Sequence, residues 1–306
     1  MAIETPPDRP TTPADISAAV NASFSSCDDE RLREIMRALV THLHAFALDV
    51  DLTQEEWEAA IRMLTETGHI TDERRQEFIL WSDVLGVSML VDLLSHPLAP
   101  KATESTVLGP FYAAGSPLRE YGASIAEGPG GEPAWVYGRV SDVDGRPIGG
   151  AELDVWQNSQ NRLYAVQDQQ VPEHHLRGRF RTREDGRYAF LGIRPVPYTI
   201  PADGPVGKML GATGRHPWRP AHIHIVVRAP GYRTLTTHIF DAASPYLDSD
   251  AVFAVKPSLV REFKRRSAAD PDRPTSIEGE WYSVENDLVL APGQEPSEPG
   301  DPGRTA

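Results

Sequence analysis

Residues 218–227 read Trp218-Arg219-Pro220-Ala221-His222-Ile223-His224-Ile225-Val226-Val227 and predict an X-Pro turn that leads into a β-strand. Because side chains alternate along a strand, His222 and His224 leave one face, whereas Ile223, Ile225 and Val227 leave the other and suit a core. Two imidazoles side by side on a rigid backbone are either half of a metal site or a partly buried pair with ordinary hydrogen bonds. The metal interpretation requires further ligands from elsewhere in the chain.

Further β-strands are predicted on both sides of this stretch. Short apolar and β-branched segments bounded by turn residues lie at residues 135–140, 151–156, 180–182, 188–191, 234–240 and 281–290. Glu184-Asp185-Gly186, between two of them, has the composition of a hairpin turn. Several short strands at regular spacing predict a β-sandwich.

The first third of the chain has a helical pattern instead. Apolar residues recur at three- and four-residue steps through residues 32–46, in a helix expected to begin near Asp28 or Asp29. A second helix is expected from Thr53, where Thr-Gln-Glu-Glu fits a capping box, to about Gly68. The fold class predicted is therefore mainly β, with an N-terminal α-helical domain.

A third helical stretch covers residues 72–94, with Gly86 as a break. Its second half is apolar nearly all round, which indicates burial between layers or at a subunit contact. On periodicity alone, Asp83 within it faces solvent. The predicted division of the chain is a flexible arm (1–27), a helical dimerisation domain (28–105), a β-sandwich catalytic domain (106–290) and a disordered tail (291–306).

Composition limits the possible partners and compartments. The 306 residues carry a formal net charge of −14, which argues against nucleic acid or an anionic membrane surface as a partner. Cys27 is the single cysteine, so an intrachain disulfide or a cysteine metal cluster is excluded. We expect neither a signal peptide nor a membrane span, and a reducing cytoplasm is the expected location.

Candidates for the missing metal ligands are few. The sequence has no second His-x-His, no His-Glu-x-x-His and no Asp-x-Asp calcium loop, so a zinc hydrolase is poorly supported. Two tyrosines stand in unusual contexts: Tyr164 follows a predicted strand, and Tyr198 lies between Pro197 and Pro201, which fix the backbone around it. Taken alone, each is more often a core or interface aromatic than a ligand.

Taken together, these segments resemble the intradiol ring-cleaving dioxygenases, the family of catechol and hydroxyquinol 1,2-dioxygenases. The resemblance extends from the helices after Asp28 through Leu290. It rests on several separate motifs in the same order, namely Leu108-Gly109-Pro110-Phe111-Tyr112, Leu153-Asp154-Val155-Trp156-Gln157, Phe180-Arg181-Thr182 with Asp185-Gly186-Arg187-Tyr188, Tyr198-Thr199-Ile200-Pro201, Gly204-Pro205-Val206-Gly207 and Arg219-Pro220-Ala221-His222-Ile223-His224.

The resemblance implies a non-haem Fe(III) held by Tyr164, Tyr198, His222 and His224. Phenolate oxygens are hard anionic donors, which suit Fe(III) better than Fe(II). The resemblance also implies that the enzyme opens the ring of a substrate with two adjacent phenolic hydroxyls, using O2. Tyr198 is then expected to dissociate from the metal and help to take a substrate proton, and Arg219 to stabilise charge that develops on the ring.

Three segments resemble the hydroxyquinol branch of the family more than the catechol branch. They are residues 213–218, residues 237–240 and residues 246–253. Catechol enzymes usually carry Gln at the position of His238. The predicted reaction is therefore cleavage of hydroxyquinol (benzene-1,2,4-triol) to 3-hydroxy-cis,cis-muconate, the enol form of maleylacetate.

The same resemblance gives Asp83 a different interpretation, as a pocket residue near the third hydroxyl of the substrate. A carboxylate there would discriminate strongly, because a ring without that hydroxyl leaves it unpaired. Leu108 departs from the pattern, since hydroxyquinol enzymes often have an aromatic residue there, and this bears on which ring substituents are tolerated. The predicted substrate contacts are Leu80, Asp83, Val107, Leu108, Gly109, Pro110, Phe111, Ile200, Pro201, Arg219, His238 and Val252.

The family also implies a homodimer through the N-terminal helices, with a phospholipid in an apolar tunnel at the interface. The apolar stripes of residues 32–94 are compatible with this assembly. Two other functions fit parts of the sequence. One is a catechol or chlorocatechol 1,2-dioxygenase. The more distant one is a non-catalytic β-sandwich that binds a lipid or another small apolar ligand, which would not need both tyrosines.

Overall fold

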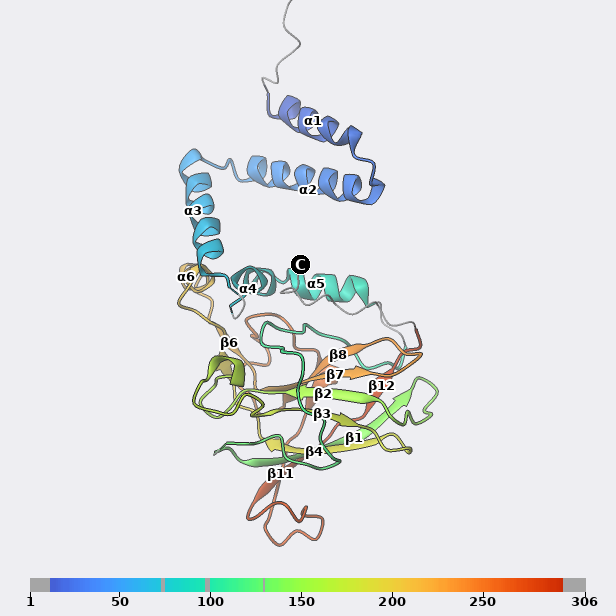
Figure 1. The fold of residues 1–306 in the computed structure, drawn as a ribbon. Helices are drawn as coiled ribbons and strands as arrows, with labels where there is room; N and C mark the ends of the chain where they lie inside the picture. The colour runs from blue at the N-terminus through green and yellow to red at the C-terminus, as the bar shows by residue number, and fades with distance from the viewer. Residues whose placement is uncertain (1–11, 73–74, 97–99, 129, 294–306) are drawn as a thin grey trace, which may run out of the picture. The chain divides into compact units, whose positions relative to one another are not determined.

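The computed structural model describes residues 12–72, 75–96, 100–128 and 130–293. By the density of contacts, the chain divides into two compact units, Met1–Thr65 and Glu66–Ala306. The first unit holds helices, and the second holds further helices and all the strands (Figure 1). The predicted fold class is confirmed, whereas the finer domain boundaries stay a prediction.

Residues 12–26 differ from the predicted flexible arm. Helix α1 (Pro13–Ser23) and the short 3-10 helix η1 (Phe24–Ser26) occupy them. The Thr12 hydroxyl accepts a hydrogen bond from the backbone N–H of Asp15, and the Asp15 carboxylate accepts one from the Thr12 N–H. This capping box, with a proline at the first helical position, starts a helix despite the proline-rich composition. Residues 1–11 lie outside the described part of the chain.

The next two helices begin where the sequence predicts. Helix α2 (Glu30–Asp49) follows Asp29, whose carboxylate accepts hydrogen bonds from the backbone N–H groups of Arg31 and Leu32 in the first turn. Helix α3 (Gln54–Ile70) starts at the expected capping box of Thr53 and Glu56. The predicted end at Gly68 is wrong, because the α3 hydrogen bonds continue as far as Thr71 N–H to Thr67 C=O.

Residues 77–95 form two helices that are separated at Gly86, where the sequence predicts a break. Helix α4 (Glu77–Val84) and helix α5 (Val87–Ser95) meet at 76°, because Gly86 adopts a left-handed φ of +75°. Most apolar side chains of α5 are exposed, and only Met89 and Asp92 are buried. Within the described residues, no single helix is long and apolar enough to cross a membrane, and only this bent pair taken together reaches that length and composition.

The remainder of the second unit is built on two five-stranded sheets. In one, β1 lies between β4 on one side and β11 and β12 on the other, and β10 pairs with β11. The other has the order β3-β2-β7-β8-β9. The bounds are β1 Pro133–Asp142, β2 Glu152–Trp156, β3 Arg177–Arg181, β4 Arg187–Ile193, β7 His222–Arg228, β8 Leu235–Asp241, β9 Val260–Arg261, β10 Lys264–Arg266, β11 Trp281–Glu285 and β12 Leu288–Leu290.

Smaller elements lie in the connections between these strands. They include a two-stranded ribbon that carries two of the predicted site residues. Their bounds are β5 Tyr198–Thr199, β6 Trp218–Arg219, α6 Pro205–Ala212, η2 Ala165–Gln167 and η3 Pro257–Leu259.

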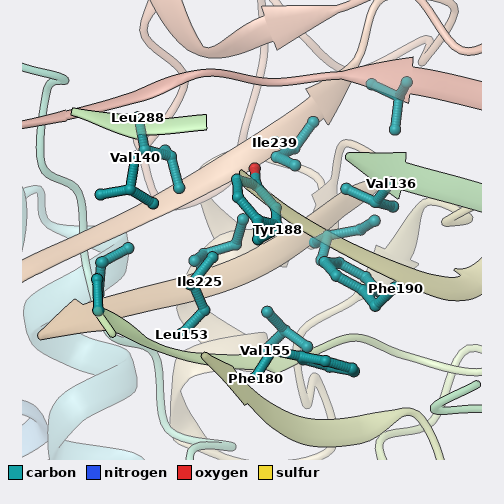
Figure 2. Close-up of a cluster of buried hydrophobic side chains, with 14 of the residues drawn as sticks. Val136, Val140, Leu153, Val155, Phe180, Tyr188, Phe190, Ile225, Ile239 and Leu288 are labelled. Atoms are coloured by element: carbon teal, nitrogen blue, oxygen red, sulfur yellow. The ribbon is translucent and has the colours of Figure 1, made fainter. Parts of the chain in front are cut away.

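The two sheets pack face to face around a hydrophobic core, which confirms the predicted sandwich. Side chains from both sheets interdigitate, among them Val136 and Phe190 from one and Val155 and Ile225 from the other (Figure 2). Ile223, Ile225 and Val227 of β7 all belong to this core, as the alternation of the opening stretch predicts. The histidines of β7 therefore lie on the outer face of the sandwich.

Two predicted strand arrangements are wrong. Residues 183–187 form a tight turn, with Arg183 N–H bonded to the carbonyl of Arg187, but β3 and β4 belong to different sheets rather than to one hairpin. Residues 281–290 are two strands, both parallel to β1. Of the predicted tail, Pro292 forms an isolated β-bridge with Tyr232, and residues 294–306 lie outside the described part.

Tyr188 ties the sandwich core to the connection between β11 and β12. Tyr188 lies among the core side chains (Figure 2). Its buried hydroxyl donates a 2.6 Å hydrogen bond to the carbonyl of Asn286. Tyr188→Phe leaves that buried carbonyl without this donor and should lower the free energy of unfolding by about 1–3 kcal/mol. Urea denaturation measures the loss. Tyr282→Phe, which removes an exposed hydroxyl 3.4 Å from Glu132, should change stability by less than about 0.5 kcal/mol. Equal losses in both variants would contradict this account.

Candidate metal centre

Four of the predicted site residues come from three separate segments. His222 and His224 leave the outer face of β7. Tyr198 lies in the short strand β5, opposite Arg219 of β6. Tyr164 immediately precedes η2, where its backbone N–H is held by the side chain of Gln167. All four side chains are 2% exposed or less, so the structure brings them together in a dry environment.

The polar atoms of these side chains lie close together. Tyr164 Oη and His222 Nε2 are each 3.1 Å from His224 Nε2. The guanidinium Nη1 of Arg219 lies 3.3 Å from both Tyr198 Oη and His222 Nε2. The rings of Tyr164 and Tyr198 meet edge to face, with centroids 5.3 Å apart. Two phenol oxygens and two imidazole nitrogens thus face one small region.

Burial keeps Tyr164, His222 and His224 neutral unless a cation compensates them. The pKa of Tyr164 is raised well above its ordinary value by burial and then by the adjacent Tyr198. Burial is the main cause that lowers the pKa values of His222 and His224 well below the ordinary value. At His222 the charge of Arg219 lowers the pKa further. At His224 the neighbouring His238 and then His222 lower it further. Neutral imidazoles have the lone pairs that a metal needs, and a bound trication would favour the phenolates. The donor set therefore fits a hard, highly charged metal ion.

The hydrogen bonds of the two histidines leave the same ring atom available in each. Nδ1 of His222 lies 2.7 Å from the carbonyl of Pro220, which can only accept, so Nδ1 carries the proton and Nε2 a lone pair. Nδ1 of His224 lies 2.7 Å from Nε2 of His238. A set of His222, His224 and His238 is also geometrically able to hold a metal. We favour the set with the tyrosines, because Nε2 of His224 faces Tyr164 whereas His238 contacts the opposite side of its ring.

Aromatic rings fix the orientation of these ligand candidates. Trp156 of β2, the register partner of His224, stacks on that imidazole at 4.6 Å with 10° between the planes. Phe111 stacks on Tyr164 at 4.7 Å. A Cβ at Gly109 would lie 3.3 Å from Cε1 of His224, and Gly109 has a φ of +78°, so a side chain there would be strained and crowded. Sequence reasoning did not single out Trp156, although its alternation on β2 could have placed it beside His224.

Arg219 is held by a residue that sequence reasoning missed. Asp250 accepts hydrogen bonds from Nε and Nη2 of Arg219, at 3.1 and 3.3 Å, and both side chains are buried. The same carboxylate accepts the N–H groups of Val252 and Ala254. Burial lowers the pKa of Arg219, but the charge and hydrogen bonds of Asp250, together with the neighbouring Tyr198 and Tyr164, more than offset this and raise it. The guanidinium therefore stays charged beside Tyr198.

Asp83 is buried, not solvated as its periodicity predicts. The side chain lies on α4 and is 4% exposed. Burial raises the pKa of its carboxyl, and the negative charge of Asp250 raises it further. A hydrogen bond from Ser88 and the positive charge of Arg219 act in the opposite direction and lower this pKa. A carboxyl in such surroundings is a candidate functional group. The interpretation of Asp83 as a pocket residue agrees with this burial.

The other predicted substrate contacts surround the tyrosines. One buried cluster joins Tyr164 and Tyr198 to Leu80, Val107, Phe111, Ile200 and Val252, with Leu108 packed against it. Pro110 and Pro201 are half-buried in the same segments. His238 is different, because both of its ring nitrogens already have protein partners, His224 and Thr106. Any contact of His238 with a substrate would have to come from its ring carbons.

Comparison with known proteins identifies the class. A family model described as "Catechol dioxygenase N terminus" matches residues 29–103, and one described as "Dioxygenase" matches residues 107–292. The chain belongs to the intradiol ring-cleavage dioxygenases, a family of non-haem iron enzymes. This confirms the family resemblance inferred from the sequence motifs.

Within that family, hydroxyquinol 1,2-dioxygenases are among the similar proteins. The chain is 49% identical over 282 residues to the hydroxyquinol 1,2-dioxygenase of Nocardioides simplex, covering 91% of this chain and 95% of the relative. The structure of hydroxyquinol 1,2-dioxygenase from Pseudomonas putida DLL-E4 matches with a TM-score of 0.87 and 49% identity, over 92% and 99% of the two chains. Catechol 1,2-dioxygenase from Pseudomonas arvilla C-1 matches with a TM-score of 0.81 but 29% identity, over 95% of each chain.

The pairing of Arg219 with Asp250 predicts a large stability effect. Asp250→Asn keeps the shape but leaves the buried guanidinium without its counter-charge, so the free energy of unfolding should fall by about 3–5 kcal/mol. Urea denaturation measures this loss. Glu280→Gln removes the partner of Arg265 in an exposed ion pair and should cost no more than about 1 kcal/mol. A loss below that of Glu280→Gln would show that Asp250 does not hold Arg219 in this way.

Proposed function

We propose that the protein is an Fe(III)-dependent intradiol 1,2-dioxygenase that cleaves hydroxyquinol with O2 to 3-hydroxy-cis,cis-muconate. The observation that carries the proposal is the buried convergence of two tyrosine oxygens with two imidazole Nε2 atoms. Tyr164, Tyr198, His222 and His224 would hold the metal. This donor set suits Fe(III), whereas two histidines with one carboxylate would suit Fe(II).

When bound, Fe(III) supplies the Lewis acidity that lowers the pKa of both hydroxyls of the substrate. Tyr198 takes one of the released protons on its Oη. The 3.3 Å contact with Nη1 of Arg219 keeps that oxygen oriented. Arg219, held charged by Asp250, lies where it stabilises negative charge that develops on the substrate ring. The aromatic packing around these side chains excludes water, which strengthens that electrostatic effect.

The specificity for a trihydroxy ring rests on Asp83. Its buried carboxylate is a hydrogen-bond acceptor near the charge of Arg219, and the third hydroxyl of hydroxyquinol would occupy it. A ring with two hydroxyls would leave this carboxylate desolvated, with the hydrogen bond from Ser88 but none from the substrate. The hydroxyquinol 1,2-dioxygenases at 49% identity support this choice over the catechol enzyme at 29% identity. Leu80, Val107, Leu108, Gly109, Pro110, Phe111, Ile200, Pro201 and Val252 complete the proposed pocket.

The active form proposed is a homodimer through the N-terminal helices. The exposed apolar face of helix α2 supports this assembly. Its apolar side chains recur at three- and four-residue spacing and are about half exposed, namely Leu32, Ile35, Leu39, Leu43 and Phe46. A phospholipid at the interface is part of the same proposal, because such a face suits acyl chains. The single Cys27 is consistent with a cytoplasmic location.

Colour and iron content test the metal proposal. Purified protein should carry one iron per chain and a broad visible band from tyrosinate-to-Fe(III) charge transfer. Tyr164→Phe and His222→Ala should each lose the band or the iron. Tyr121→Phe, which removes a tyrosine hydroxyl elsewhere and keeps the ring that stacks on Arg183, should retain both. A preparation that stays colourless with added iron would favour the non-catalytic ligand-binding sandwich.

Oxygen uptake with benzene-1,2,4-triol and with catechol tests the role of Asp83. The parent enzyme should prefer the triol, and Asp83→Asn should reduce the ratio of the two kcat/KM values by about 10- to 150-fold, the equivalent of ~1.5–3 kcal/mol for a hydrogen bond to a charged group. Asp203→Asn, at an exposed carboxylate paired with Arg75, should leave the ratio unchanged. Comparable parent rates on both substrates would support the catechol or chlorocatechol alternative instead.

A further inference from the structure

A chain of three buried side chains runs from the metal centre into the loop that carries the pocket. Nδ1 of His224 lies 2.7 Å from Nε2 of His238, and Nδ1 of His238 lies 3.0 Å from Oγ1 of Thr106. All three residues are 2% exposed or less. His238 stands directly opposite His224 in the register of β7 and β8. Neither ring nitrogen of His238 is free, so hydrogen bonds to protein groups hold the imidazole at both nitrogens.

The positions of the protons along this chain follow from one requirement. His224 must keep the lone pair of Nε2 for a metal, so its proton is on Nδ1 and is donated to Nε2 of His238. His238, accepting at Nε2, then carries its own proton on Nδ1. The hydroxyl oxygen of Thr106 is the acceptor of that proton. Each hydrogen bond therefore determines the tautomer of the next ring.

We propose that His238 is a positioning residue that holds His224 in the metal-binding tautomer and orientation, and that Thr106 fixes His238 for this task. The inference rests on the proposed Fe(III) site. It gives His238 a hydrogen bond to the proposed metal ligand His224, in place of the substrate contact expected from the sequence. Metal-bound histidines generally donate their second N–H to a protein acceptor, and the loss of that acceptor weakens metal binding.

The two proposed histidine ligands differ in how they are held. His222 donates to the backbone carbonyl of Pro220, which no substitution removes. His224 depends on a side chain, which in turn depends on Thr106. The backbone N–H of Thr106 is bonded to the carbonyl of Thr236 on β8, so the loop is fixed to the same strand that carries His238. Residues 107–111, which follow Thr106 directly, line the proposed pocket.

Iron affinity, measured by chelator competition on the full chain, tests this role. His238→Leu should weaken Fe(III) binding about 10- to 100-fold and shift the visible band, because Nδ1–H of His224 loses its acceptor. His238→Gln supplies an amide oxygen in its place and should stay within about threefold of the parent. Thr106→Val should weaken binding by about three- to tenfold, since it acts one step further away.

Thr237→Val is the matched control. The buried Thr237 also lies on β8 and donates a hydrogen bond to this loop, at the carbonyl of Glu104, but its hydroxyl is not part of the chain from His224 through His238 to Thr106. Its substitution should reduce stability like Thr106→Val yet leave iron affinity and the band unchanged. Equal weakening by both threonine variants, or parent-like affinity and band in His238→Leu, would overturn the inference. If the parent itself bound no iron, the proposed function would fail first.

Discussion

The alternation of side chains along β7 is the constraint on which the rest of the structure depends. Ile223, Ile225 and Val227 pack in the core between the two sheets, so the side chains of His222 and His224 must both project from the outer face. A slip of register by one residue would place the imidazoles in the core between the sheets and turn the isoleucines to the outer face. The hydrophobic effect that stabilises the sandwich therefore also fixes the face of β7 from which the two histidines project.

The remaining groups of the site are placed on that outer face by rigid local structure. Tyr198 is held in a two-residue strand opposite Arg219, and Tyr164 is held by stacking against Phe111. One buried positive charge, Arg219, lies among these neutral donors and is matched by Asp250. The result is a dry region whose polar atoms are oriented before any ligand arrives, which is the condition for strong electrostatic catalysis.

Local patterns in the sequence predicted what depends on near neighbours, such as the caps of α2 and α3 and the alternation of β7. They failed for features that depend on contacts between segments far apart in the sequence. The turn at residues 183–187 forms locally, but which sheets its two strands join is set by pairing with β1 and β2. The role of Asp250 was missed for the same reason: residues 246–253 resemble the hydroxyquinol branch, but the function of this carboxylate shows only when the fold brings Arg219 to it. The tyrosines were found through family motifs, since spacing alone did not connect them to the histidines.

The partners of β1 bear on how this protein is made. Ala134 pairs with Tyr282, and the central strand also pairs with β12, near the end of the described chain. Such a high contact order slows folding, because long loops must close before these pairs form. A nascent chain emerging from the ribosome cannot complete this sheet until β11 and β12 have been synthesised. The proposed donor set is likewise incomplete until His224 has been synthesised, so the four residues can hold a metal together only after that point.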